Sequence, residues 1–142
     1  MVRTTLAAVG GVVGSNLELR GVSHSFDFEG APLLLLHTLG AKSNAERVNP
    51  VMYLEEAGRL FVFASKAGAD VNPDWYYNLL ANPEVTVELD DETFAATAVV
   101  LHGEERDRVY ATQAKERPQF AEYQEKTTRV IPVVELHRIG PE

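Results

Sequence analysis

A loop between two apolar segments carries the residues with the most distinctive chemistry. Residues 37–50 read HTLGAKSNAERVNP and place Lys42 and Arg47 five positions apart, after a run of four leucines. Gly40 and Ser43 add small size, a hydroxyl group and backbone N–H groups that can point at an anion. Arginine offers a planar fork that matches phosphate, and lysine offers a point charge. The loop therefore suggests an anion site, with ordinary solvated loop cations as the alternative.

A third cation, Lys66, follows Ser65 at the end of another apolar segment. If the strand expected over residues 31–38 neighbours the strand expected over residues 59–65, all three cations gather at one end of a sheet.

The protein as a whole is acidic, with a net charge of −8 over 142 residues. Such a protein repels a phosphate backbone, which argues against nucleic acid as a partner. An anion site must then be a local concentration of cations. The chain has no cysteine, which removes disulfides, thiol nucleophiles and most structural zinc sites and favours a reducing cytoplasm.

Two aromatic clusters could border a flat ligand. In DWYYNL, Trp75 and Tyr76 could form the floor under a ring while the start of a helix offers N–H groups to a polar edge. The alternative is that Trp75 and Leu79, four positions apart, belong to the core. In RPQFAEYQ, Phe120 and Tyr123 share one helix face and either cover a pocket or pack into the wall of the protein.

Several common functional motifs are absent. The sequence contains no phosphate-binding P-loop, no G-x-G-x-x-G and no G-x-S-x-G. The four histidines stand far apart, without a pair at i and i+4, so we predict no metal site. The acidic residues 90–92 lie between two alternating segments, which favours a solvated hairpin turn over a cation site.

Alternating and continuous apolar runs predict mostly strands. Strands are expected over residues 31–38, 48–56, 59–66 and 130–139, with a hairpin of two strands over 84–101. Helices are expected over 73–81, with Asn72 as the N-cap, and over 103–127, with a break at Pro118. The order is β-β-β-α-β-β-α-β. We therefore predict a mainly β (α+β) protein whose six or so antiparallel strands close into a small barrel.

Four separate segments resemble one known family. They read GAKSNAERVNPVMY, FVFASKAGA, NPDWYYNLLANPEVTVEL and RPQFAEYQEKTTRVIPVVEL. In this order and spacing they resemble the deazaflavin (coenzyme F420)-dependent nitroreductase family of actinobacteria, which includes F420H2-dependent quinone reductases. The resemblance covers about residues 31–138. Its most specific parts are the G-x-K-S loop with an arginine five residues after the lysine, the S-K pair, and N-P-x-W-Y-x-N-L-x-A-N-P.

The resemblance implies a split β-barrel related to FMN-binding split barrels. It also implies that reduced F420 transfers a hydride from the deazaflavin C5 to a quinone, an activated nitroaromatic or a conjugated enone. The tail of F420 is a phosphodiester followed by glutamates, so a collar of Lys42, Arg47 and Lys66 suits it. Hydride transfer depends mainly on position and ring electronics, which agrees with the absence of a catalytic triad.

The resemblance also suggests roles for single residues. Lys42, Arg47 and Lys66 correspond to positions that meet the phosphate and the acidic tail, and Ser65 corresponds to a strand edge facing the ring. Tyr123 and Ser65 are the expected catalytic residues, as hydroxyl groups that could supply a proton, with solvent as the alternative source. The expected cofactor-binding residues are Ala41, Lys42, Ser43, Arg47, Val48, Pro50, Phe63, Ala64, Ser65, Lys66, Asp74, Trp75, Tyr76, Tyr77, Asn78 and Phe120.

Two positions depart from the family pattern. Asn44 stands where many members have glycine, so the backbone of the loop could differ. Phe120 stands where some members have tyrosine, so a hydroxyl group on the substrate side could be missing.

The domain organisation follows from the same comparison. We expect an N-terminal arm or helix over residues 1–30 and a single cofactor-binding split barrel over residues 31–142. The apolar stretch Leu6–Val13 is too short to cross a bilayer, and an arm is favoured over a signal peptide. Residues 21–32 are expected near the substrate side of the pocket, with a disordered tail as the alternative.

Other readings stay open. The same barrel could use FMN, whose phosphate suits the same cations, or the protein could bind F420 without catalysis. The expected partner is a small-molecule acceptor. A homodimer through an exposed barrel edge, and a cytoplasmic location close to the inner face of the cell membrane, are further expectations.

Overall fold

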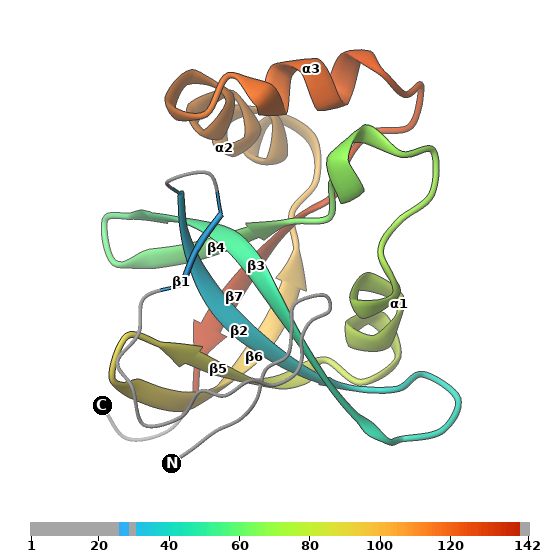
Figure 1. Cartoon of the computed structure of the whole chain (residues 1–142), viewed down its shortest axis with the longest axis vertical. Helices are drawn as coiled ribbons and strands as arrows, with labels where there is room; N and C mark the ends of the chain where they lie inside the picture. The colour runs from blue at the N-terminus through green and yellow to red at the C-terminus, as the bar shows by residue number, and fades with distance from the viewer. Residues whose placement is uncertain (1–25, 29–30, 140–142) are drawn as a thin grey trace.

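Strands dominate the computed structural model, which describes residues 26–28 and 31–139 (Figure 1). Within these residues, the strands and helices, with a single 3-10 turn (η1), are β1 Phe26–Phe28, β2 Ala31–Leu39, β3 Glu46–Glu56, β4 Arg59–Phe63, η1 Lys66–Gly68, α1 Asp74–Ala81, β5 Glu84–Leu89, β6 Glu92–Val100, α2 Gly103–Glu116, α3 Gln119–Glu125 and β7 Val133–Arg138. The mainly β fold with a few helices is therefore confirmed.

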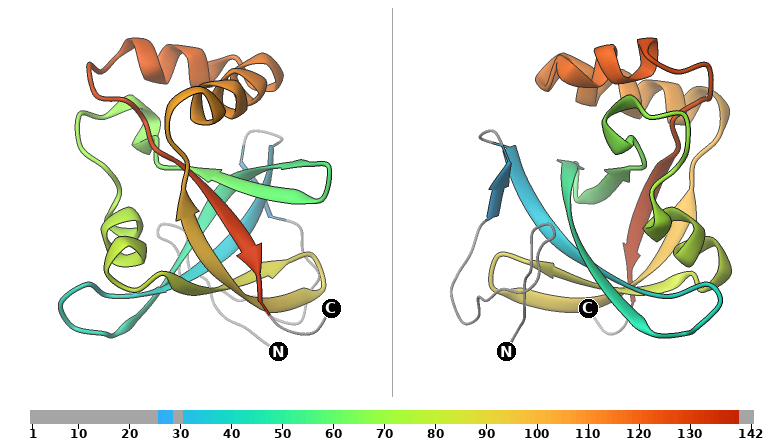
Figure 2. Two further views of the ribbon diagram at one scale, coloured as in Figure 1. Left: turned by 180° about the vertical axis from the view of Figure 1, so that it is seen from behind. Right: turned by 45° about the vertical axis from the view of Figure 1, so that its right-hand side comes forward.

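Six of the strands form a closed split barrel. Antiparallel pairs run in the order β2-β3-β4-β7-β6-β5, and a further pairing of β2 with β5 closes the ring. The short β1 adds to the outer side of this ring by pairing with β2. Figure 2 shows α2 and α3 together over one end of the barrel, and α1 on its flank beside the β2–β3 hairpin. The expectation that β2 neighbours β4 is wrong, because each hairpin pairs consecutive strands and β3 therefore lies between them.

Alternation along β4 divides the apolar side chains between two cores. Leu60 and Val62 point into the barrel, where they meet a core that includes Leu36. Phe61 and Phe63 point the other way, into a second core under α2 and α3. Successive side chains of a strand face opposite sides, so one apolar strand can serve both layers. Each fully buried side chain of this size contributes about 1.5–3 kcal/mol to folding.

Several predicted boundaries are wrong by a few residues. The strand expected over 59–66 ends at Phe63, because the chain turns into η1. The last strand begins at Val133 rather than at residue 130, just after a proline, which has no N–H group for a ladder. Asn72 does not cap α1: Pro73 occupies that position without a side-chain cap. The Asn72 side chain instead accepts a hydrogen bond from Arg129 and donates one to the Tyr77 hydroxyl.

The N-terminal arm predicted over residues 1–30 lies almost entirely outside the described residues. Of these thirty positions the structure describes 26–28 alone, as β1. In the described part of the chain, none of the helices combines the length and the apolar character needed to cross a membrane.

The closing seam of the barrel carries a histidine between two glutamates. His37 on β2 bonds through Nδ1 to Glu46 Oε2 at 2.7 Å, and through Nε2 to the carboxylate of Glu88 on β5. Burial of the ring lowers the pKa of His37, but the hydrogen bonds and charges of Glu88 and Glu46 outweigh it. The pKa is therefore raised above its ordinary value of 6.5. Only the protonated ring can donate to both carboxylates.

We predict that His37 stabilises the barrel more at low pH than at high pH. Because folding raises its pKa, its contribution is complete below about pH 6.5 and is lost as the pH rises through the folded pKa. Urea titrations should show that the difference in free energy of unfolding between the wild type and His37→Gln shrinks from about pH 6 to about pH 9. The exposed His102 gives a control, His102→Gln, that should show no such trend. A difference that stays constant for His37→Gln would contradict the prediction.

Candidate functional site

A cleft opens between β3 and the segment that runs from η1 to the start of α1. Its first part, here the apolar half, is a cavity of about 380 Å3 lined by Leu33, Pro50, Val51, Met52, Phe63, Ser65, Lys66, Ala67, Pro73, Trp75, Phe120 and Tyr123. Its second part, the cationic half, is a cavity of about 430 Å3 lined by Gly40, Ala41, Lys42, Ser43, Arg47, Asn49, Asp74, Tyr77 and Asn78. Asn49 is followed by Pro50, and Pro73 by Asp74, so on both walls consecutive residues of the chain line the two cavities.

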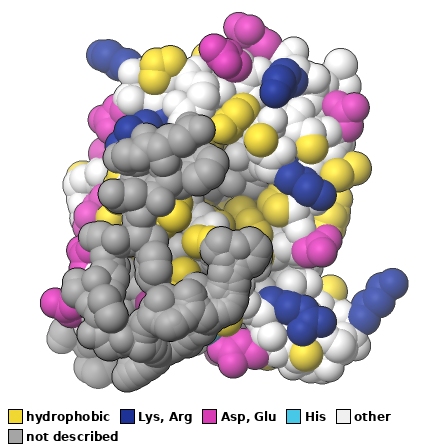
Figure 3. Space-filling view, viewed as in Figure 1, with side chains coloured by type: hydrophobic (Ala, Val, Ile, Leu, Met, Phe, Trp, Pro, Cys, Tyr) yellow, Lys and Arg dark blue, Asp and Glu magenta, His cyan; other side chains and the backbone are white. Residues whose placement is uncertain are grey.

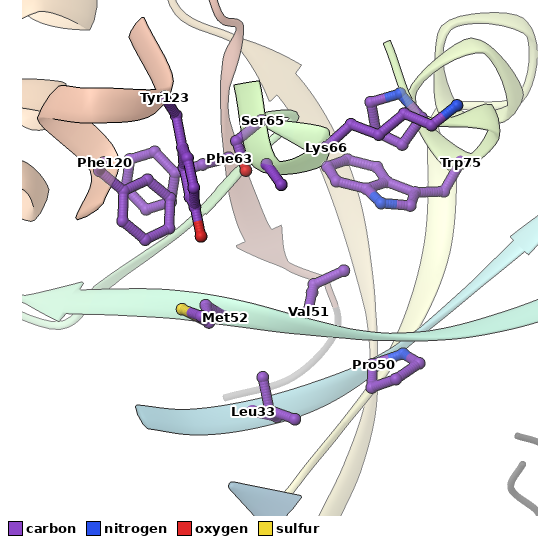
Figure 4. A pocket seen from close by; sticks show the side chains of 12 residues that line it. Leu33, Pro50, Val51, Met52, Phe63, Ser65, Lys66, Trp75, Phe120 and Tyr123 are labelled. Atoms are coloured by element: carbon purple, nitrogen blue, oxygen red, sulfur yellow. The ribbon is translucent and has the colours of Figure 1, made fainter. Parts of the chain in front are cut away.

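The apolar half is a gap between β3 and a wall of aromatic side chains. Figure 4 shows Val51 and Met52 on β3 across the cavity from Trp75 and Tyr123, with the hydroxyl end of Tyr123 directed toward the gap; Pro50 lies on the other side of the β3 ribbon in this view. In Figure 3 hydrophobic side chains gather in a central hollow, and Lys and Arg side chains lie along its right-hand side. The cavity therefore suits a flat, mostly apolar ligand.

Trp75 serves the core and the cleft together. Its side chain is only 6% exposed and belongs to the barrel core, as does Leu79 at 2%. The core interpretation of this i, i+4 pair is thus confirmed. Trp75 nevertheless lines the apolar half, so a ring there would rest on a side chain that packing holds still.

Helix α3 brings Phe120 and Tyr123 to the other end of the apolar half. The two rings meet edge to face with centroids 5.0 Å apart, which confirms the shared helix face. Phe120 is 2% exposed and also contacts Phe63, with centroids 5.6 Å apart. The Tyr110 hydroxyl donates to the Phe120 carbonyl at 2.6 Å. Burial raises the pKa of Tyr110 to about 12, so this donor keeps its proton at neutral pH.

The loop of the cationic half is closed by its own hydrogen bonds. The Gly40 N–H donates to the Ala45 carbonyl at 2.8 Å, and the Asn44 N–H donates to the Gly40 carbonyl at 2.9 Å. A Cβ on Gly40 would lie 2.6 Å from Ser43 Oγ and would displace that side chain, which accepts a hydrogen bond from the Ala45 N–H at 3.0 Å. Asn44 has φ of +59°, a left-handed conformation that glycine adopts readily and asparagine tolerates. Asparagine at this family glycine position is therefore compatible with the turn.

Asn78 ties this loop to α1. Its side-chain oxygen accepts a hydrogen bond from the Ala41 N–H at 3.0 Å, and its side-chain nitrogen donates to the Thr38 hydroxyl at 3.2 Å. Asn78 is 8% exposed and Thr38 2%. Both polar atoms of the Asn78 side chain therefore hold the loop against the helix. This fixes the position of the neighbouring cations.

The cations of the cleft have no carboxylate partners within the described residues. None of the ion pairs formed by residues 26–28 and 31–139 includes Lys42, Arg47 or Lys66. Arg47 donates only to the Glu46 carbonyl, at 3.5 Å. Lys42 and Arg47 line the cationic half, whereas Lys66 lines the apolar half. Unpaired cations beside a cavity fit an anionic ligand, and their donor chemistry suits phosphate and carboxylate groups.

The turn after β4 holds an uncommon backbone conformation. Lys66 and Ala67 have φ of +46° and +53°, and Gly68 has +85°. Left-handed backbone costs a residue with a side chain roughly 1–2 kcal/mol, so the surrounding structure must hold it. A Cβ on Gly68 would lie 3.0 Å from the Cα and the carbonyl oxygen of Tyr123, so the turn lies directly against α3.

Comparisons with known proteins identify the family. The profile of a family described as F420H(2)-dependent quinone reductase matches residues 15–137. The chain belongs to this family. Family membership makes it an oxidoreductase that depends on reduced F420.

Individual members show how far the likeness extends. An F420H(2)-dependent quinone reductase of Mycobacterium tuberculosis is 36% identical over 110 residues, which are 75% of this chain and 74% of that protein. A solved F420-H2 dependent reductase (FDR-A) is 42% identical with a TM-score of 0.71, over 82% of this chain and all of that one. A second solved chain, described as a domain-swapped dimer, is 42% identical with a TM-score of 0.68, over 74% of this chain and 79% of that chain.

Most of the site residues expected from the family resemblance line the cleft. In the apolar half these are Pro50, Phe63, Ser65, Lys66, Trp75, Phe120 and Tyr123. In the cationic half they are Ala41, Lys42, Ser43, Arg47, Asp74, Tyr77 and Asn78. Val48, Ala64 and Tyr76 line neither half: Ala64 is fully buried, Val48 is exposed, and Tyr76 packs against the barrel core. In the described residues, no three histidine or acidic side chains are placed to hold a metal ion.

Sequence reasoning missed several lining residues. Leu33, Val51, Met52, Ala67 and Pro73 belong to the apolar half, and Asn49 to the cationic half. The run of four consecutive leucines has no alternation, so the sequence did not indicate that Leu33 is the one that lines the cleft. Pro50 and Met52 share one face of β3 by alternation, a pattern that could have linked them.

Proposed function

We propose that this family member binds reduced F420 along the whole cleft and reduces a quinone. The deazaflavin ring occupies the apolar half, and the phosphate and glutamate tail occupies the cationic half. The observation that carries this proposal is an apolar cavity next to one lined by cations that lack carboxylate partners in the described residues.

Charge explains why the tail belongs in the cationic half. The protein carries a net charge of −8, so its overall field repels a polyanion. Lys42 and Arg47 oppose that repulsion locally, and Arg47 can grip a phosphate with two parallel donors. Asp74, on the same wall, would oppose an anion but can accept a hydrogen bond from a hydroxyl group on the chain between ring and phosphate.

Shape and polarity explain why the ring belongs in the apolar half. When bound, reduced F420 supplies a hydride from C5 of its ring. The protein holds the reacting groups between Met52 on β3 and the aromatic wall of Trp75 and Tyr123, and excludes water from the gap. Rigid side chains around the cavity favour one orientation of the ring.

The acceptor needs a proton as well as a hydride, because a quinone becomes a hydroquinone only by gaining both. The hydroxyl groups of Tyr123 and Ser65 line the cavity and can donate to a quinone oxygen. Nitroaromatic and conjugated enone acceptors have polar oxygens that the same donors can meet, so the proposal extends to them.

We predict that the cations of the loop determine affinity for F420. Each charge-assisted contact contributes about 1.5–3 kcal/mol, so Lys42→Ala or Arg47→Ala should weaken F420 binding about 10- to 150-fold. Because the tail lies away from the reacting atoms, KM for F420H2 should rise while kcat changes little. Binding should also weaken with added salt. Fluorescence titrations with F420, and parallel titrations with FMN, measure these changes and separate the two cofactors.

The control for the loop is Lys115→Ala, an exposed cation on α2 away from the cleft. Normal F420 affinity without salt sensitivity in a Lys42→Ala/Arg47→Ala double mutant would show that these residues are only solvated loop cations. Failure of menadione to oxidise bound F420H2 would instead favour a non-catalytic F420-binding protein.

We predict that Tyr123→Phe slows the reduction of acceptors and leaves F420 binding intact. The change keeps the ring that packs on Phe120 and removes one positioned donor, so kcat with a quinone should fall by up to about 100-fold. Stopped-flow oxidation of F420H2 by menadione measures this step. Tyr77→Phe, in the cationic half, should leave kcat unchanged. An unaltered rate in Tyr123→Phe would mean that Ser65 or solvent supplies the proton.

Assembly as a homodimer stays a prediction. Its support is the similar solved chain described as a domain-swapped dimer. Light scattering coupled to size exclusion should then give twice the mass of the chain, and a mass equal to one chain would contradict it.

A location near the inner face of the cell membrane also stays a prediction. Its physical reason is that quinone acceptors of low polarity partition into lipid. Sedimentation with anionic lipid vesicles checks it, and protein that remains wholly in the supernatant would contradict it.

A further inference from the structure

Arg129 lies behind the turn that borders the apolar half. It belongs to the segment between α3 and β7 and is half-buried. Its Nε donates to the Ala69 carbonyl at 2.9 Å, and one terminal nitrogen donates to the Asn72 side-chain oxygen at 2.6 Å. Its other terminal nitrogen donates to the carbonyls of Ala64 at 3.2 Å and Ser65 at 3.0 Å. In the described part of the chain these partners are all neutral oxygens, and the guanidinium forms no ion pair.

These acceptors lie on both sides of the left-handed turn. Ala64 and Ser65 precede Lys66, and Ala69 follows Gly68. The guanidinium therefore links the two ends of the turn by hydrogen bonds. The turn itself supplies only two backbone hydrogen bonds, from Gly68 N–H to the Ser65 carbonyl and from Ala69 N–H to the Lys66 carbonyl. Strained backbone persists only where its surroundings determine it from several sides. The planar guanidinium, with donors in fixed directions, is suited to that task.

This turn faces the site of the proposed reaction. Ser65, Lys66 and Ala67 line the apolar half, whereas Arg129 does not. Ser65 is right-handed and Lys66 is left-handed, a succession that directs neighbouring N–H groups into a concavity for an anionic or carbonyl oxygen. Through Asn72, Arg129 also connects to the Tyr77 hydroxyl in the cationic half, at 3.3 Å from the Asn72 side-chain nitrogen.

Arg129 is itself held by the helical layer. Its carbonyl accepts a hydrogen bond from the Gln124 side chain at 2.7 Å, and its N–H donates to the Thr127 hydroxyl at 3.3 Å. Gln124 also accepts from the Ile131 N–H at 3.1 Å and from Arg106 at 2.7 Å. The position of the guanidinium is thus fixed relative to α2 and α3.

We propose that Arg129 is a positioning residue for the cofactor. It holds the turn at residues 65–68 in the conformation that presents the turn's N–H groups and Lys66 to the polar edge of the deazaflavin ring. This inference rests on the proposed function, because it assumes that F420 occupies the cleft.

The test compares two conservative variants in the full chain. Arg129→Lys keeps the charge and removes the link between the two ends of the turn. Arg59→Lys is the matched control: Arg59 is also half-buried and donates twice to the Glu135 carboxylate, at 2.8 Å and 2.9 Å. Its hydrogen bonds reach neither the turn nor Gln124, and it does not line the cleft. Urea titrations identify conditions in which both variants are folded. Affinity for oxidised F420 is then measured by fluorescence, and hydrogen exchange of residues 64–72 is measured without cofactor.

Arg129→Lys should weaken F420 binding about 10-fold, as expected for the loss of one charge-assisted hydrogen bond. Exchange of residues 64–72 should speed up by a similar factor, because the turn opens more often. Arg59→Lys should lose stability with neither effect. Asn72→Ala removes one acceptor and should change both readouts in the same direction by less, which keeps the test available if Arg129→Lys does not fold.

Unchanged affinity and exchange in Arg129→Lys would overturn the proposal, as would equal changes in Arg59→Lys. The two readouts also separate this inference from the proposed function. A wild-type protein that binds no F420 would refute the proposed function. The exchange rates in the cofactor-free protein would still decide whether Arg129 holds the turn.

Discussion

The pairing of β2 with β5 is the constraint on which the site depends. Only two residues separate the end of α1 from β5, so pairing β5 with β2 brings α1 alongside the end of β2. There Asn78 reaches the Ala41 N–H and the Thr38 hydroxyl. The loop with Lys42 and Arg47 is thereby fixed to the same helix whose first turn carries Trp75. Barrel closure thus joins the cationic and apolar halves into one cleft.

The two halves solve different physical problems. In the proposed binding mode, an acidic protein holds a polyanionic tail with a few cations that lack carboxylate partners in the described residues. The ring needs an environment of low polarity with a fixed floor, which Trp75 gives because it is also part of the barrel core. Between them the turn at Lys66 adds backbone donors, at the cost of left-handed conformations that neighbouring segments must hold. Binding and positioning are therefore distributed over residues that the fold already immobilises.

Local patterns predicted the strands, the hairpins and the break at Pro118, because alternation and proline act over a few residues. They also identified the loop cations. Interactions between distant segments escaped them. The segment RLFVFASK has the pattern of one strand, although its last residues form a turn. Arg129 donates hydrogen bonds to this turn and its neighbours, and these partners lie 57 to 65 positions away in the sequence. Asn72 looked like a helix cap, but the same arginine takes its side chain. The order of β2, β3 and β4 follows from hairpin pairing and could have been predicted from the sequence. The burial of Ala64 could not have been predicted in this way.

The central claim is that one cleft holds the ring and the tail in different halves. The most direct measurement compares the affinity of the wild-type protein for F420 with its affinity for the deazaflavin ring that lacks the phosphate and glutamates, at increasing salt concentrations. F420 should bind at least about 100-fold more tightly at low salt, as expected for two charge-assisted contacts, and this advantage should fall as salt rises. Equal affinity for both compounds, or an advantage that salt does not change, would contradict the claim.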